Sequence, residues 1–357
     1  MKKVLFVIGT MDNGGAERVV SVLSGELAKR GYNVSIITII DCTINYKLDE
    51  RVHIVPMQLK GNGAKKNFYR ISELRKEIKR SDVVISFLAI VNMATLIAGI
   101  GLKKRVILSE RNDPAKEPNS KKSRLIRNLM YKVLHCNYFV FQTEDARNYF
   151  DKTVKKKSVI IPNPITDLPE VYIGDREKKI VTIARLEPQK NLNLLISSFA
   201  KVCNKYPEYN LQIFGRGPQL DELNIYASKL GVENKVKFCG FSNKVHEEIK
   251  NAEMYVMSSD YEGISNGMIE ALGLGIPTIA TDCPIGGARM HIKNGYNGLL
   301  VPVGNEKELT AAMFKVIEEP ELAKKLGRSA VHIREELDVK KITSLWEDLI
   351  EDRINED

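Results

Sequence analysis

The order of apolar and polar segments along the chain predicts alternating strands and helices. Short apolar runs rich in β-branched residues are typical of strands buried in a parallel sheet. We expect such strands in the first half of the chain at Lys3–Ile8, Asn33–Ile40, Asp82–Leu88, Arg105–Ser109, Tyr138–Thr143 and Val159–Ile161. A second set is expected at Lys179–Ala184, Leu211–Gly215, Val236–Phe238 and Pro277–Thr281. Because helical patterns separate these strands, the chain is predicted to be α/β with two parallel sheets.

Apolar residues at helical spacing predict helices between the strands and after them. The expected helices are Ala16–Gly31, Asn92–Ile100, Asn119–His135, Met268–Leu274, Lys307–Glu335 and Lys340–Ile354. The third of these has an apolar stripe with a basic flank made of Lys121, Lys122, Arg124, Arg127 and Lys132. Such stripes usually pack into a core, so we favour core packing over membrane insertion for Leu125, Ile126, Leu129, Met130, Val133 and Leu134.

A Pro-rich stretch at Pro162–Pro169 is the predicted linker between two domains. We expect a first domain at residues 1–165 and a second at residues 172–338, with a last helix at about 340–357 packing back on the first. The total of 357 residues is enough for two α/β domains that each bury a core. A cleft between two such domains is a common site for small molecules.

Charge is distributed unevenly between the two halves. Residues 1–170 carry 30 basic and 17 acidic residues, whereas residues 171–357 carry 24 basic and 28 acidic ones. The first half therefore offers positive potential to a membrane surface, a phosphate or a nucleic acid. No recognition motif with interleaved aromatic residues supports a nucleic-acid partner.

Cysteine and histidine spacing argues against a metal site. The five cysteines are scattered without a CxxC pair, and the histidines lack metal-ligand spacing. The apolar run Val4–Ile8 is too short for an export signal, and no run is long enough to span a bilayer. We therefore expect a cytoplasmic protein with reduced thiols and no metal.

The stretch 258–287 contains the first candidate chemistry. Glu262 and Glu270 are eight residues apart, so we expect them to lie two helical turns apart on nearly one face. Ser265 and Asn266 are good helix caps, and a helix that begins there directs its positive end at a possible anion. Paired glutamates are also common on solvated helices, so the spacing by itself does not decide.

Three further groups follow predicted strands, where open α/β sheets place their ligands. Arg185 and Lys190 follow the first strand of the second domain and suit a diphosphate, although a solvated pair would look the same. Gly14 and Gly15 allow close approach to a phosphate or sugar, with a simple tight turn equally compatible. The adjacent glycines do not match a dinucleotide fingerprint. The polar SERNDP segment at 109–114 follows another strand.

Taken together, these segments resemble the GT-B glycosyltransferases of family 4. The resemblance rests on E-G-x6-E, A-L-x-x-G-x-P-x-I-A, the R-L…K-N segment and FGRGP, and it is strongest over Thr182–Pro302. It implies two Rossmann-like domains facing across a cleft, with Arg185, Lys190 and Glu262 as the catalytic residues. It also implies a donor site comprising Gly14, Gly15, Arg185, Lys190, Gly215, Phe241, Glu262, Gly263, Ile264, Ser265, Asn266 and Glu270.

The resemblance implies a retaining transfer of a hexose or N-acetylhexosamine from a UDP-sugar, without metal or other cofactor. The acceptor would lie at Glu110, Arg111 and Asn112, where Arg111 replaces a histidine found in many relatives. The SER start looks most like enzymes that extend undecaprenyl-diphosphate-linked oligosaccharides. We therefore expect a lipid-linked acceptor and peripheral contact with the inner face of an anionic membrane. A nucleotide-sugar epimerase and a soluble-acceptor glycosyltransferase are the alternatives.

Overall fold

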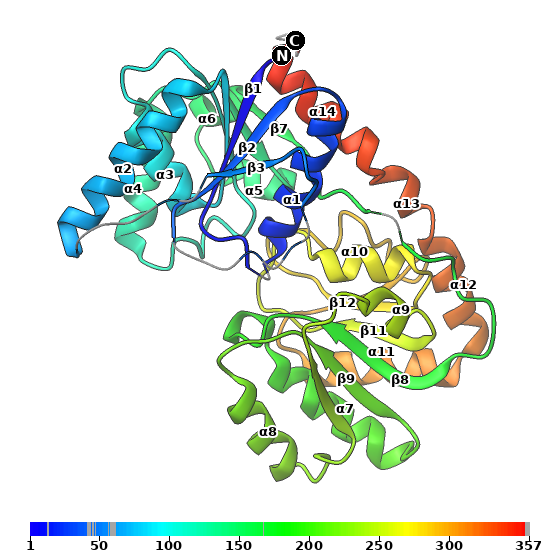
Figure 1. Ribbon diagram of the computed structural model, residues 1–357. Coiled ribbons are helices and arrows are strands. Elements are labelled where there is room, and N and C mark those ends of the chain that lie inside the picture. Colours follow the sequence, from blue (N-terminus) through cyan, green and yellow to red (C-terminus); the bar gives the residue numbers. More distant parts are fainter. Residues whose placement is uncertain are drawn as a thin grey trace. The chain divides into compact units, whose positions relative to one another are not determined.

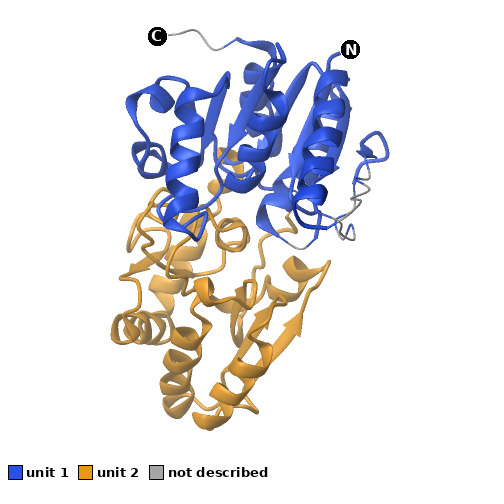
Figure 2. Ribbon diagram, turned by 90° about the vertical axis from the view of Figure 1, so that its left-hand side faces the viewer, with its two compact units in different colours: residues 1–166, 337–357 blue, residues 167–336 orange. Residues whose placement is uncertain are grey.

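The computed structural model describes residues 1–12, 14–40, 44, 46, 48–55, 57, 62–166 and 168–353. The chain divides into two compact units (Figure 2). Unit 1 comprises residues 1–166 and 337–357, and unit 2 comprises residues 167–336. Each unit has its own parallel sheet and its own hydrophobic core, so the predicted two-sheet α/β fold is confirmed.

Unit 1 is built on a parallel sheet in the order β3-β2-β1-β4-β5-β6-β7. Its strands are β1 (Lys3–Ile8), β2 (Asn33–Thr38), β3 (His53–Val55), β4 (Val83–Phe87), β5 (Arg105–Ser109), β6 (Tyr138–Phe141) and β7 (Ser158–Ile160). The central strands are buried almost throughout, which explains why they read as continuous apolar runs. The short edge strand β3 is half-buried or exposed, and it was not predicted.

Helices connect and cover this sheet (Figure 1). They are α1 (Gly15–Lys29), α2 (Gly63–Arg80), α3 (Ala89–Gly99), α4 (Lys121–Val133), α5 (Glu144–Asn148), α6 (Lys152–Lys156) and α14 (Val339–Glu351). The last helix lies beside α1, where Arg30 Nη1 donates to Glu347 at 2.7 Å and Tyr32 donates to the same carboxylate at 3.0 Å. Residues from both ends of the sequence therefore build one unit.

Trp346 anchors α14 to the sheet. This side chain is fully buried and stacks on Phe87 of β4, with ring centroids 5.6 Å apart. The two segments that leave and re-enter unit 1 also pair with each other, because Ile165 N donates to Leu337 O at 2.8 Å. The chain thus leaves and returns at one place.

The apolar stripe of α4 faces solvent, so its predicted packing into the core is wrong. Leu125, Leu129 and Val133 are 70%, 62% and 69% exposed. The buried residues of this helix are instead Arg127 and Tyr131.

The reason is a set of contacts on the opposite face of α4. Tyr131 donates a short hydrogen bond to Glu110 and stacks on Phe150 at 5.8 Å. Arg127 donates to Pro114 O at 2.9 Å and lies 4.9 Å from the Phe150 ring centroid. The polar and aromatic face of α4 is therefore buried against unit 1, and the aliphatic face is exposed to solvent.

Unit 2 has a parallel sheet in the order β10-β9-β8-β11-β12-β13. Its strands are β8 (Glu177–Ile183), β9 (Asn210–Phe214), β10 (Val236–Gly240), β11 (Ala252–Met257), β12 (Thr278–Thr281) and β13 (Leu299–Val301). Its helices are the 3-10 turn η1 (Pro188–Lys190), α7 (Leu192–Lys205), α8 (Leu220–Lys229), α9 (Val245–Ile249), α10 (Asn266–Gly273), α11 (Glu306–Glu318), α12 (Pro320–Ala330) and α13 (Ile333–Glu336).

The single helix expected at 307–335 is three helices. Helix α11 ends before Glu319, whose φ of −117° and ψ of 75° are not helical. Pro320 then begins α12, where its missing N–H costs no hydrogen bond. A further break after Ala330 separates α13. The apolar period continues across both breaks, which is why periodicity alone did not reveal them.

Candidate functional site

Four loops meet at the carboxyl edge of the sheet in unit 2. They follow β8, β9, β11 and β12, which are neighbouring strands in the order β9-β8-β11-β12. Backbone hydrogen bonds join these loops: Leu186 N donates to Arg216 O at 2.9 Å, and Asp260 N donates to Gln189 O at 2.9 Å. Thr281 Oγ1 donates to Ser259 O at 2.6 Å. The predicted site residues of the second half lie on these loops, on α10 and just after β10.

Glycines allow the loops to approach one another closely. A Cβ on Gly215, whose φ is +141°, would lie 1.9 Å from Ala184 O, and one on Gly287 would lie 1.8 Å from Gly263 O. Any side chain at these positions would force the loops apart.

Phe241, the remaining predicted residue from this edge, is half-buried directly after β10.

Lys190 and Glu262 form an ion pair inside this group of loops. Their side chains are only 12% and 13% exposed, and the contact is short. Gln189 Nε2 also donates to Glu262 at 3.3 Å and to Tyr261 O at 2.9 Å. In a partly buried pair of this kind, the attraction between the two charges offsets part of the cost of taking both from water.

Arg185 is more exposed than Lys190. Its side chain is 47% exposed and donates to Glu187 at 2.9 Å. The guanidinium can therefore turn towards an anion without losing a buried contact. Together, Arg185 and Lys190 provide two cations within six residues at one sheet edge, which suits a diphosphate.

Helix α10 begins at this edge, with Ser265 as its N-cap. The Ser265 side chain accepts from Met268 N at 3.4 Å, and Asn266 is the first helical residue. The helix dipole therefore places partial positive charge among the loops. Since the helix begins only at Asn266, Glu262 lies in the preceding loop, and our placement of Glu262 and Glu270 on one helical face is wrong. Glu262 reaches the site from a loop, and Glu270 from the helix.

Glu270 has a partner that the sequence did not reveal. The residue is 4% exposed, and its Oε2 lies 2.9 Å from Nε2 of His246 on α9. The two residues are 24 positions apart and belong to different helices, and no local pattern links them. The contact fixes one oxygen of the carboxylate.

The predicted glycines of unit 1 lie at the start of α1, after β1. Gly14 is the N-cap residue, and a Cβ there would come within 1.9 Å of Glu17 Oε2. The Glu17 carboxylate also accepts from Thr10 at 3.0 Å. Because an anionic group already lies against this helix end, the surroundings favour a neutral hydroxyl-bearing group at Gly14 and Gly15 over a second anion. The preceding Asn13 lies outside the described residues.

The predicted acceptor residues follow β5, and all three make contacts inside unit 1. Glu110 is 4% exposed and accepts from Tyr131, and burial raises the pKa of its carboxyl. Asn112 is partly buried and donates to Glu117 at 2.6 Å. Glu110 is therefore a buried support of the loop, while Asn112 lies nearer the surface.

Arg111 is held between aromatic rings. Its guanidinium carbon lies 4.9 Å from the Phe87 centroid and 5.4 Å from that of Trp346. Nη1 donates to Ile161 O at 3.2 Å and to Asn163 Oδ1 at 3.3 Å. Burial lowers the pKa of Arg111 to about 9. The residue therefore ties the end of β5 to the segment that leaves unit 1 and to α14.

Among the described residues, no cluster of three or more histidine, cysteine or acidic side chains is arranged to hold a metal ion. Within the same part of the chain, no helix has the length and apolar character needed to cross a bilayer.

Two family models match the chain and together span residues 13–332. The model described as Glycosyltransferase Family 4 matches residues 13–167, and the one described as Glycosyl transferases group 1 matches residues 166–332.

Curated relatives cover nearly the whole chain. One is a Campylobacter jejuni protein named GalNAc-alpha-(1->4)-GalNAc-alpha-(1->3)-diNAcBac-PP-undecaprenol alpha-1,4-N-acetyl-D-galactosaminyltransferase. It is 28% identical over 98% of this chain and 98% of its own length. Another, an uncharacterized glycosyltransferase of Haemophilus influenzae, is 28% identical over 98% of this chain and 100% of its own.

Solved structures show the same fold. The Anabaena protein Alr3699/HepE in complex with UDP-glucose superposes with a TM-score of 0.85 at 18% identity, covering 99% of this chain and 100% of that one. The apo form of the lipopolysaccharide outer core galactosyltransferase WaaB gives a TM-score of 0.73 at 18% identity, covering 99% and 100%. Likeness at this level of identity concerns the fold, which is GT-B.

Proposed function

The chain belongs to the family 4, group 1 glycosyltransferases, which use nucleotide sugars, and from that membership we propose which sugar donor and acceptor it takes. The donor is a UDP-hexose or UDP-N-acetylhexosamine, and the acceptor is a glycan on a polyprenyl diphosphate. The observation that carries the donor half is the Lys190–Glu262 pair among four joined loops at the carboxyl edge of unit 2.

The charge that grows during transfer is on the leaving diphosphate. We assign its stabilisation to Arg185, Lys190 and the N-terminus of α10, because all three provide positive charge at one sheet edge. In this proposal the diphosphate binds Lys190 in place of Glu262. The Glu262 carboxylate then accepts hydrogen bonds from the sugar hydroxyls. The ion pair therefore holds both groups at the site before the donor binds.

Glu270 is assigned to the ribose hydroxyls. One of its oxygens contacts His246, and this contact orients the carboxylate. Gly215 and Phe241 come directly after β9 and β10, and we assign to them the binding of the base and the ribose. Gly263 and Ile264 complete the loop that precedes the α10 cap.

Family membership supports retention of anomeric configuration. We propose that the bond between the anomeric carbon and the diphosphate oxygen breaks as the acceptor oxygen bonds to the same face of that carbon. The acceptor proton passes to the departing phosphate oxygen. The protein contributes charge neutralisation and positioning, and the diphosphate itself serves as the base.

The proposal of a lipid-linked acceptor is supported by two relatives. One is the Campylobacter jejuni protein described above, at 28% identity, and the other is a second Campylobacter jejuni protein, 27% identical over 91% of this chain and 92% of its own length; both are named for transfer to glycans on diphospho-undecaprenol. The basic excess of the first half suits contact with the inner face of an anionic membrane. We place the acceptor near Asn112, with Glu110 and Arg111 shaping that loop.

The test combines a donor screen with product analysis. Thermal stabilisation across a panel of UDP-sugars identifies the donor, and product analysis follows with that donor alone and with polyprenyl-diphosphate-linked glycan. We expect transfer only when the lipid-linked glycan is present. Conversion of the sugar without acceptor would indicate an epimerase, and transfer to a free oligosaccharide alone would contradict the lipid-linked acceptor.

Arg185→Ala is the matched variant for the donor half. It should lower turnover on the order of a hundredfold, because one charged stabiliser of the leaving group is lost. Its side chain is half exposed, so folding should be unchanged, and a circular dichroism spectrum checks this. Near-normal turnover would remove Arg185 from the catalytic assignment.

A further inference from the structure

Four buried polar atoms around the Phe87 ring have no hydrogen-bond partner among the described residues. They are Ser109 Oγ, Arg111 Nε, Arg111 Nη2 and Trp346 Nε1. Arg111 is 8% exposed, and Ser109 and Trp346 are 0% exposed. Buried polar atoms are nearly always hydrogen-bonded, because each one left without a partner costs free energy. Four such atoms in one place therefore indicate a bound group that forms hydrogen bonds with them.

The three residues that carry these atoms lie together on one face of the sheet in unit 1. The Trp346 ring stacks on Phe87 at 5.6 Å, and the guanidinium carbon of Arg111 lies 4.9 Å from the Phe87 centroid and 5.4 Å from that of Trp346. Ser109 of β5 is the register partner of Phe87 of β4. Register partners place their side chains on the same face of a sheet, so the Ser109 hydroxyl lies on the Phe87 side as well. We call Ser109, Arg111 and Trp346 the donor cluster.

The positive charge of Arg111 has no carboxylate beside it in the described part of the chain. Its Nη1 donates to two neutral oxygens, Ile161 O at 3.2 Å and Asn163 Oδ1 at 3.3 Å, and burial is the cause of its lowered pKa. Arg127, which is also buried, differs because its charge lies near that of Glu110. Buried charges in proteins are normally paired, because an unpaired one is costly to take from water. The two aromatic rings offset part of this cost, but they leave the charge uncompensated.

The chemistry of the donor cluster favours an anion over a water molecule. The remaining N–H groups of Arg111 and the indole N–H of Trp346 can only donate, and only Ser109 Oγ can also accept. A water would bring two further hydrogens to a cluster with one acceptor. An anion accepts from every donor and also neutralises the guanidinium. A monovalent ion matches the single charge of Arg111, whereas sulfate or phosphate would leave excess negative charge in the interior.

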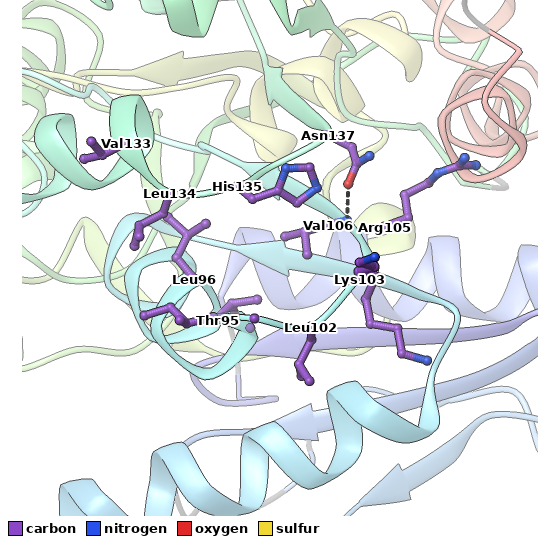
Figure 3. A pocket seen from close by; sticks show the side chains of 14 residues that line it. Thr95, Leu96, Leu102, Lys103, Arg105, Val106, Val133, Leu134, His135 and Asn137 are labelled. Atoms are coloured by element: carbon purple, nitrogen blue, oxygen red, sulfur yellow. Dashed lines mark hydrogen bonds between the residues drawn. The ribbon is translucent and has the colours of Figure 1, made fainter.

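The lysines of a nearby pocket provide a different environment for an anion. This pocket has a volume of about 570 Å³ and lies between the ends of α3 and α4, where Lys103 and Lys104 line it (Figure 3). Both lysines precede β5, whereas Ser109 and Arg111 lie at the carboxyl end of that strand. Lys103 is exposed, so its charge stays hydrated and is screened by salt. The two lysines therefore serve as a control for nonspecific attraction of anions.

We propose that the donor cluster binds a chloride ion inside unit 1. The ion accepts hydrogen bonds from Arg111, Trp346 and Ser109, and it provides the negative charge that Arg111 lacks. Arg111 also joins the end of β5 to the segment 161–163, so the ion fixes the loop that follows β5. The site is separate from the nucleotide-sugar chemistry of the proposed function and can be tested without transfer.

Trp346 itself reports on the site, because it is the only tryptophan of the chain. Bromide resembles chloride in size and charge, and it quenches the fluorescence of an indole that it contacts. The protein is first dialysed into sodium gluconate, and bromide then replaces gluconate at constant ionic strength. We expect saturable quenching that an excess of chloride reverses. Quenching that rises linearly with bromide, or that chloride does not reverse, would overturn the proposal.

Two variants test the assigned ligands. Ser109→Ala removes a hydroxyl that bonds to no described residue, so the fold should be retained and bromide affinity should fall about tenfold. Arg111→His should abolish saturable quenching, and Ser109→Ala decides alone if Arg111→His does not fold. The matched control Ser198→Ala removes a similarly buried and unpartnered hydroxyl from α7 of unit 2 and should leave the quenching unchanged. Wild-type affinity in either cluster variant would contradict the assignment and overturn the proposal.

Thermal unfolding gives a second readout. An ion that binds only the folded chain stabilises it, so the unfolding midpoint should rise as chloride replaces gluconate at constant ionic strength. Arg111→His should lose this rise, and the double variant Lys103→Ala/Lys104→Ala should keep it. Equal midpoints in chloride and gluconate would show that water fills the cluster, and loss of the rise in the lysine variant would show binding at the surface. Either result overturns the chloride site, and neither bears on the transferase assignment, because no donor or acceptor is present.

Discussion

The Lys190–Glu262 pair makes a quantitative prediction, because removing each partner should have a different effect. Two unit charges in contact at an effective dielectric constant of about 20 attract by roughly 4 kcal/mol, much of which offsets the cost of taking both from water. With the side chains only 12% and 13% exposed, little of that attraction is screened. Lys190→Ala should lower turnover by on the order of a hundredfold, about 2.7 kcal/mol, because the leaving diphosphate loses a cation.

Glu262→Gln should strengthen the binding of UDP. Without the carboxylate, the diphosphate no longer competes with an internal anion for Lys190, so UDP affinity should rise about fivefold, or roughly 1 kcal/mol. Turnover should nevertheless fall strongly, since the sugar hydroxyls lose their charged partner. Gln189, which donates to the same carboxylate oxygen, keeps an acceptor in the glutamine variant.

Calorimetry with UDP and single-turnover assays with the donor chosen by the thermal screen measure the two effects. The double variant Lys190→Ala/Glu262→Gln should bind UDP like Lys190→Ala alone. Without Lys190, the diphosphate and residue 262 no longer compete for the same cation. Near-normal turnover in Lys190→Ala would refute the reasoning. So would loss of UDP binding in Glu262→Gln together with normal binding in Glu270→Gln, which would reverse the two roles.

Two further predictions concern His246 and His291. His246→Ala should weaken the binding of UDP about tenfold and leave the binding of 2′,3′-dideoxy-UDP unchanged, because only UDP has the ribose hydroxyls assigned to Glu270. Equal weakening for both nucleotides would show that His246 has a structural role only. Burial lowers the pKa of His291 to about 4, so the unfolded chain takes up its proton first as the pH falls. Unit 2 should therefore lose up to about 3 kcal/mol of stability between pH 6.5 and pH 4. Thermal unfolding of His291→Leu should show a flatter acid limb, and an identical limb would contradict the assignment.

The sequence was sufficient for several strands that are buried on both faces, although β11 (Ala252–Met257), which is almost fully buried, was missed. Lys3–Ile8 and Arg105–Ser109 are strands with the predicted bounds, because strands buried on both faces need continuous apolar residues. The half-exposed strand His53–Val55 was missed for the same reason, since its three residues carry no such run.

The sequence was insufficient where tertiary partners decide. The aliphatic face of α4 looked like a core face, but the interior was taken by Tyr131 with Glu110 and by Arg127 with backbone carbonyls. Likewise, the spacing of Glu262 and Glu270 suggested one helix, whereas the helix begins at Asn266. The His246–Glu270 contact joins two helices across 24 residues, and only the folded chain brings them together.

The sharing of unit 1 between both ends of the chain has a consequence for synthesis. Its sheet is complete at residue 160, but Trp346, which covers Phe87, follows only after the whole of unit 2 has been made. At ribosomal rates the intervening stretch takes ~10–30 s, during which Phe87 lacks its stacking partner. Unit 2 can fold as a continuous segment in that interval. The nascent chain therefore finishes its second domain before its first, and a chaperone has that long to bind the uncovered sheet.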